Sequence, residues 1–136
     1  MGAWSHEPFG NDTACDWAYG LDEQRDFSLI AKAIQAVLDN GSDYLDSDLA
    51  SEAIAAVEIL AKALGRGTQT DSYTEDVDAW VKSIAAKPSQ DLLSKAIVAL
   101  TRIMGPDSEL RELWEESDDF ANWESSIKAL QSAVVA

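Results

Sequence analysis

Apolar residues recur along this chain every three or four positions, which is the spacing of one face of an α-helix. The longest stripe runs from Leu49 to Leu64, and a second runs from Phe120 to Val134. Shorter stripes cover residues 14–21, 30–38, 77–84 and 93–104. No segment alternates apolar and polar residues for long enough to indicate a β-strand. The pattern therefore predicts an all-α, single-domain bundle of six or seven helices over residues 1–136.

Turn and cap residues separate the stripes. Asn40-Gly41 and Leu64-Gly65 each follow a stripe, where glycine in the left-handed conformation often ends a helix. Residues 65–72 form the longest expected loop. Pro88 suits the first turn of the helix that follows it. We expect helix starts and N-caps at Asn11 or Asp12, Ser47 or Asp48, Thr74, Ser108 and within Ser117 to Asp119.

The chain is strongly acidic, with 25 Asp and Glu against 10 Lys and Arg and a formal net charge of −15. Phosphate binding needs clustered basic residues, so this charge excludes nucleic acid as an ordinary partner. It also disfavours anionic membranes. A charge of this sign attracts a basic partner, although solubility alone is a second explanation.

Localisation and redox chemistry follow from short patterns. No apolar run reaches the ~18–20 residues of a membrane span, and the first residues lack the features of a secretory signal. We therefore expect a cytoplasmic protein. Cys15 is the only cysteine, which rules out an internal disulfide. Its acidic neighbours should raise the thiol pKa, so a buried structural cysteine is expected rather than a nucleophile.

The N-terminal segment combines aromatic and polar residues. Residues 1–10 are expected to form a docked arm, because Trp4 and Phe9 are costly to leave in water. A group of polar side chains follows the same segment: His6, Glu7, Asn11, Asp12 and Asp16. These types can ligate a metal, and Asp12 and Asp16 share a helix face. The alternative is that Asn11 or Asp12 caps the first helix while Phe9 and Trp17 pack inward.

The same opening resembles a bacterial domain-of-unknown-function family. Members begin Gly-x-Trp-Gly and continue Phe-x-Asn-Asp-x-Ala-x-Asp-Trp. The matching residues here are Trp4, Phe9, Asn11, Asp12, Asp16 and Trp17. Ser5 departs from the pattern, because the family usually has glycine there. Residues 96–103, residues 108–114 and Trp123 extend the resemblance over most of the chain. It implies a small, soluble, bacterial helical protein and implies no reaction.

An acidic stretch from Asp107 to Glu124 encloses two tryptophans. Glu112 and Glu116 stand four residues apart, and such like-charge pairs cost about 0.2–0.5 kcal/mol on a helix. An aromatic anchor with an acidic rim is one way to build a binding hot spot. The other interpretation places the aromatics in the core and leaves the acids solvated. The candidate interaction surface comprises Glu112, Trp114, Glu115, Glu116, Asp118, Asp119 and Trp123.

Motifs for catalysis are lacking: the chain has one histidine, no Gly-x-Ser-x-Gly elbow and no glycine-rich phosphate loop. We therefore expect a non-enzymatic protein-interaction domain without a cofactor or metal, of an inhibitor or immunity type, for a basic partner such as a nuclease. The alternative function is a metal-dependent or small-molecule-binding module at His6, Asp12 and Asp16. A homodimer that pairs an exposed apolar stripe is a third possibility.

Overall fold

The computed structural model describes residues 3–135 of the chain. In this part of the chain it has seven α-helices and one 3-10 helix, which confirms the predicted all-α class. The elements are α1 (Asp12–Ala18), η1 (Tyr19–Glu23), α2 (Ser28–Asp39), α3 (Ser47–Ala63), α4 (Glu75–Ile84), α5 (Gln90–Met104), α6 (Glu109–Glu115) and α7 (Phe120–Ala133). Residues 3–135 contain no strand, only two isolated bridges. Within them no helix has both the length and the hydropathy needed to cross a bilayer.

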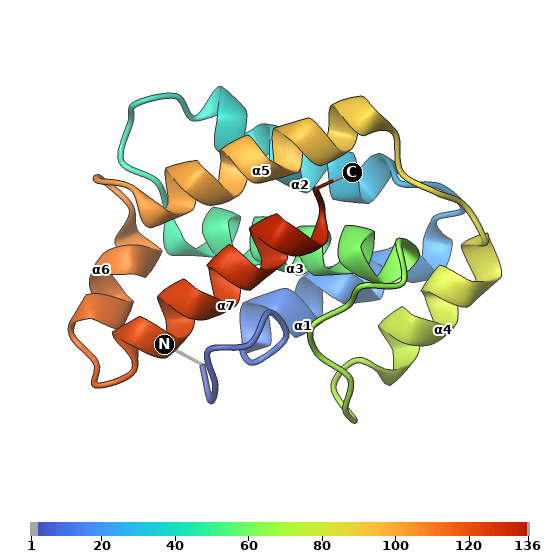
Figure 1. Cartoon of the computed structure of the whole chain (residues 1–136), viewed down its shortest axis with the longest axis horizontal. Coiled ribbons are helices and arrows are strands. Elements are labelled where there is room, and N and C mark those ends of the chain that lie inside the picture. The colour runs from blue at the N-terminus through green and yellow to red at the C-terminus, as the bar shows by residue number, and fades with distance from the viewer. Residues whose placement is uncertain (1–2, 136) are drawn as a thin grey trace.

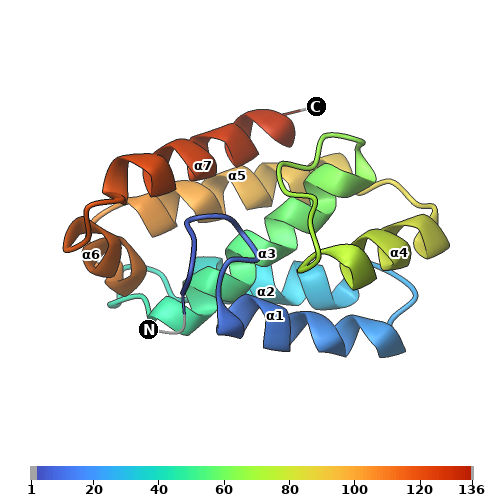
Figure 2. The ribbon, with the colours of Figure 1, turned by 90° about the horizontal axis from the view of Figure 1, so that it is seen from below.

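Helix α3 lies at the centre of the bundle and packs against each of the other six α-helices. Figure 1 shows α3 in the middle of the bundle, and Figure 2 shows it running between α5 and α7 on one side and α1, α2 and α4 on the other. Its sequence is apolar on nearly every side, as expected for a helix surrounded by others. Small side chains let the neighbouring helices approach closely. The fully buried alanines of α3 are Ala50, Ala53, Ala55, Ala56 and Ala61.

Helix ends follow the sequence with small shifts. Asn11 caps α1, because its side-chain oxygen accepts from the Ala14 N–H at 2.8 Å. Gly41 and Gly65 both have positive φ, at 60° and 77°, as expected after a helix. The predicted caps of α3 were wrong: Asp46 is the N-cap, and its carboxylate accepts from the Asp48 N–H at 2.7 Å. Pro88 precedes α5 instead of lying in its first turn, because Ser89 is the cap.

Residues 3–10 of the N-terminal arm are docked on the helices. Residues 1 and 2 of the predicted arm lie outside the residues that the structure describes. Phe9 is fully buried in the core. The Trp4 N–H donates to the Gly10 carbonyl at 2.9 Å, which closes the arm into a loop. Gly10 is required there, since a Cβ would lie 2.1 Å from Ser5 Oγ.

Candidate functional site

A buried glutamate in α3 organises the loop that follows this helix. The Glu58 side chain is completely buried, which is rare for a carboxylate without partners. Its oxygens accept from the Thr68 N–H at 2.8 Å, the Thr68 hydroxyl at 2.7 Å and the Gln69 N–H at 2.8 Å. Burial raises the pKa of Glu58, while the bonds from Thr68 and Gln69 and the nearby Lys62 charge act to lower it. Glu58 thus fixes the loop between α3 and α4.

Gln69 and Lys62 extend this buried network to the arm and to α4. The Gln69 side-chain oxygen accepts from the Phe9 N–H at 2.8 Å, and its amide nitrogen donates to Asp71 at 3.0 Å. The Lys62 ammonium lies 2.7 Å from Asp78 of α4 and also donates to the Gln69 carbonyl. The network therefore holds together the arm, the loop and α4, which are the segments that form one wall of the cleft described next.

A cleft of about 330 Å³ lies between α1 and η1 on one side and α4 on the other. We call it the α1–α4 cleft. Trp4 from the arm and the Ser72-Tyr73 turn complete its rim. Its other lining residues are Asp12, Cys15, Asp16, Ala18, Tyr19, Leu21, Asp22, Asp76, Val77 and Trp80.

Three aromatic side chains of the cleft face solvent. Trp4, Tyr19 and Tyr73 are 46%, 68% and 53% exposed. The Trp4 and Tyr73 rings lie against each other with centroids 5.0 Å apart. Trp80, in contrast, is buried, and its indole N–H donates to the Gln24 carbonyl at 3.2 Å. The cleft therefore offers exposed aromatic surface beside a firmly held indole.

All ionised side chains that line the cleft are carboxylates. Asp12, Asp16, Asp22 and Asp76 form no ion pair with any cation that the structure describes, and no Lys or Arg lines the cleft. Arg25 lies in an adjoining hollow, where it donates to the carbonyls of Asp22 and Gln24.

The cleft carboxylates also affect the pKa of Cys15. Burial raises the pKa of its thiol, and the charges of Asp12 and Asp16 raise it further. This direction agrees with the sequence prediction for Cys15. The part of this shift that comes from Asp12 and Asp16 reflects negative charge, which favours a cation, whereas burial disfavours an ion of either sign.

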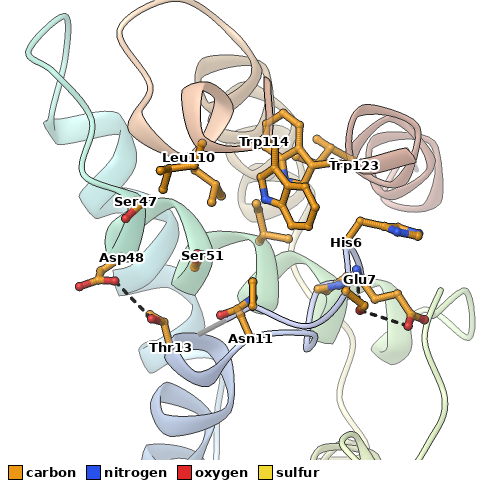
Figure 3. Close-up of a pocket in the computed structure, with 16 residues that line it drawn as sticks. His6, Glu7, Asn11, Thr13, Ser47, Asp48, Ser51, Leu110, Trp114 and Trp123 are labelled. Atoms are coloured by element: carbon orange, nitrogen blue, oxygen red, sulfur yellow. Dashed lines mark hydrogen bonds between the residues drawn. The ribbon is translucent and has the colours of Figure 1, made fainter. Parts of the chain in front are cut away.

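A second, smaller hollow lies between the arm, the start of α3, α6 and α7 (Figure 3). Its volume of about 40 Å³ leaves room for a few water molecules. Trp114 and Trp123 line it with nearly parallel rings, 6.4 Å apart at 13°. His6 also lines it and joins the arm to α7, with Nδ1 3.2 Å from Asp119 Oδ2.

The fold separates the tryptophans of the candidate interaction surface at α6 and α7 from its acidic residues. Trp114 and Trp123 are only 8% and 2% exposed, so their burial supports the core interpretation. Helix α7 packs beside α6, and both indoles belong to the hydrophobic core. The carboxylates stay at the surface, where Glu112 accepts from the Tyr44 hydroxyl and Glu115 pairs with Arg111. Glu116 and Asp118 are exposed, and Asp119 is half-buried.

The structure separates the residues of the predicted metal cluster. His6 and Asn11 line the smaller hollow, whereas Asp12 and Asp16 line the α1–α4 cleft. Among residues 3–135, no group of three or more His, Cys, Asp or Glu side chains is placed to hold a metal ion.

The aromatic and polar residues of the N-terminal motif take three different places. Trp4, Asp12 and Asp16 belong to the cleft, Phe9 and Trp17 pack on the core, and Asn11 caps α1. Sequence reasoning missed Tyr19, Asp22, Tyr73, Asp76 and Trp80 as cleft residues. They come from separate segments, so no local spacing connects them to Trp4.

Comparison with known proteins connects the chain to a protein family. A search of curated proteins and a search of solved structures gave no match. A family model, described as "Domain of unknown function (DUF4259)", matches residues 2–126. The match begins in the N-terminal arm and extends into α7. The chain therefore belongs to the DUF4259 family.

Proposed function

We propose that this chain is a bacterial, cytoplasmic protein-interaction domain that binds a basic partner protein, as an inhibitor or immunity-type protein does. The α1–α4 cleft is the observation that carries the proposal. Exposed Trp4, Tyr19 and Tyr73 stand there beside carboxylates that form no ion pair within residues 3–135. Tryptophan and tyrosine are enriched where protein interfaces gain most of their binding energy.

Electrostatics supports a basic partner. A net charge of −15 attracts a positive surface over a distance of about one Debye length, roughly 8 Å at physiological ionic strength. Such steering raises the association rate more than it raises the final affinity. A nuclease is one partner of this kind, because the surface that binds nucleic acid carries clustered Lys and Arg.

The exposed acids of the turn between α6 and α7 have a separate role in this proposal. Glu116 and Asp118 contribute to the long-range attraction, but the neighbouring indoles of Trp114 and Trp123 are buried. Charges without an adjacent apolar contact give encounter rate more than lifetime. In this proposal the exposed aromatic residues of the cleft supply the contact energy.

Selection from a random peptide library tests the proposal. The immobilised domain is exposed to displayed dodecapeptides in about 50 mM salt. The bound peptides are then washed at about 500 mM salt, and the released and retained pools are sequenced. We expect enrichment of Arg and Lys together with release at the higher salt. Peptides without basic enrichment, or binding that is indifferent to salt, contradict the proposal.

A further inference from the structure

We infer that the α1–α4 cleft holds one arginine side chain of the basic partner, with the guanidinium on the Trp4–Tyr73 rim and within reach of the cleft carboxylates. This inference rests on the proposed function and names the chemical group that the cleft recognises. It concerns residues on the arm, α1, η1, α4 and the turn before α4, which the fold brings together.

The size of the cleft matches one long side chain. Its volume of about 330 Å³ lies at the lower end of the range for ligand pockets, which is roughly 300–1,000 Å³. That space accommodates an extended side chain with the adjoining backbone, and it is too small for a partner helix. The cleft is also open to solvent at Trp4, Tyr19 and Tyr73, so a side chain can enter from outside.

The aromatic rim fits a guanidinium in particular. This group is planar and weakly hydrated, and it stacks on aromatic faces, with tryptophan the best of them. The Trp4 ring is supported by Tyr73 at 5.0 Å, and the Trp4 backbone is held by its bond to Gly10. A ring that is already held in place loses little entropy when a ligand arrives.

The carboxylates supply the opposite charge. Asp12 and Asp16 lie one turn apart on α1, Asp22 lies on η1, and Asp76 begins the opposite wall on α4. Elsewhere in the described chain Asp78 and Asp91 are within 2.7 and 3.3 Å of a lysine, whereas none of the four cleft carboxylates has such a partner. The cleft acids therefore keep acceptors that an arginine fork can bind in pairs.

Other occupants fit the same features less well. A lysine ammonium is more strongly hydrated and lacks the planar fork. An apolar segment leaves the carboxylates without compensation and strips their hydration. A second copy of this chain brings another −15 of charge, which repels.

Calorimetric titration with three capped hexapeptides tests the inference: hexa-arginine, hexa-lysine and hexa-citrulline, the last being a neutral analogue of arginine. Two variants remove equal charge from different faces. Asp16→Asn/Asp22→Asn alters the cleft, and Glu116→Gln/Asp118→Asn alters the turn between α6 and α7. No side chain among these four forms an ion pair in the described chain, so neither variant breaks one.

We expect hexa-arginine to bind more tightly than hexa-lysine, and hexa-citrulline not to bind. The cleft variant should weaken hexa-arginine binding about tenfold and the control variant less than about twofold. Trp4→Leu should remove the preference for arginine over lysine, and Tyr73→Leu serves the same purpose if Trp4→Leu does not fold. Circular dichroism verifies the fold of each variant.

The outcomes separate the two proposals. Equal losses in the cleft and control variants, or equal binding of hexa-lysine and hexa-arginine, overturn the arginine site and leave a basic partner in place. Absence of binding by both cationic peptides overturns the arginine site and also contradicts the proposed function.

Discussion

The Phe9 backbone N–H donates to the Gln69 side-chain oxygen at 2.8 Å, across 60 residues of sequence. Gln69 is in turn bound through its own backbone N–H to the buried Glu58. The arm that carries Trp4 and the loop that leads to Tyr73 are thus fixed by the same buried residues. The buried Gln69 and Glu58 therefore help to position the rim of the cleft.

Removing the Gln69 side chain should destabilise the protein. Gln69→Ala leaves the Phe9 N–H buried without an acceptor, which costs about 1–3 kcal/mol. Urea unfolding measures this loss, and hydrogen exchange at Phe9 should become faster. Thr70→Ala, at the exposed neighbouring position, is the control and should change the free energy of unfolding by less than about 0.5 kcal/mol. Similar losses in both variants contradict the role given to Gln69.

Glu58 gives a prediction for pH dependence. Because its pKa is raised in the folded protein, the folded state binds this proton more tightly than the unfolded chain does. The Glu58 contribution to stability is therefore greatest below its ordinary pKa of 4.5 and declines as pH rises through the raised value. The free energy of unfolding of the wild type, minus that of Glu58→Gln, should fall as pH rises above 4.5. A difference that rises with pH contradicts the predicted sign.

Gly10 and Ser5 form a test pair for the arm. Gly10→Ala places a Cβ where Ser5 Oγ lies, and such overpacking typically costs about 1–3 kcal/mol. Ser5→Gly removes that oxygen and should recover part of the loss, although the Ser5 carbonyl would still lie 2.8 Å from the new Cβ. Thermal unfolding of the two single variants and the double variant measures the coupling. Strict additivity would show that the side-chain clash is absent.

The tryptophans should divide into two energetic classes. Trp123→Ala empties a buried site and should cost about 3–5 kcal/mol, with Trp123→Phe as a milder variant if it does not fold. Trp4→Leu acts on a half-exposed ring and should cost far less. Chemical denaturation of these variants distinguishes the classes. Comparable losses at both positions would mean that the arm contributes to the core as much as α7 does.

Much of the helical framework could be predicted from the sequence, because helix formation depends on local spacing. The stripe from Leu49 to Leu64 became α3, and Asn11 became the cap of α1. The shift of the α3 cap to Asp46 reflects a choice among adjacent residues that all have suitable side chains. Such choices depend on backbone angles that spacing does not determine.

The candidate site was far less predictable, because it depends on contacts between distant segments. In the sequence, Glu58 cannot be told from a glutamate on the solvated face of a helix. Its burial is possible because Thr68 and Gln69 donate hydrogen bonds to its carboxylate. Trp114 and Trp123 alternate with acids in sequence, yet their burial depends on α7 folding beside α6. Asp16, Asp22 and Tyr73 meet only in the folded chain.

The most direct measurement is a two-dimensional NMR titration of the tryptophan indole N–H signals with the capped hexa-arginine peptide. Five tryptophans give five reporters, including Trp4 on the cleft rim and the buried Trp114 of α6 and Trp123 of α7. We expect a saturable shift of the Trp4 signal while those of Trp114 and Trp123 stay in place. A titration that moves Trp114 and Trp123 and leaves Trp4 unchanged would contradict this expectation.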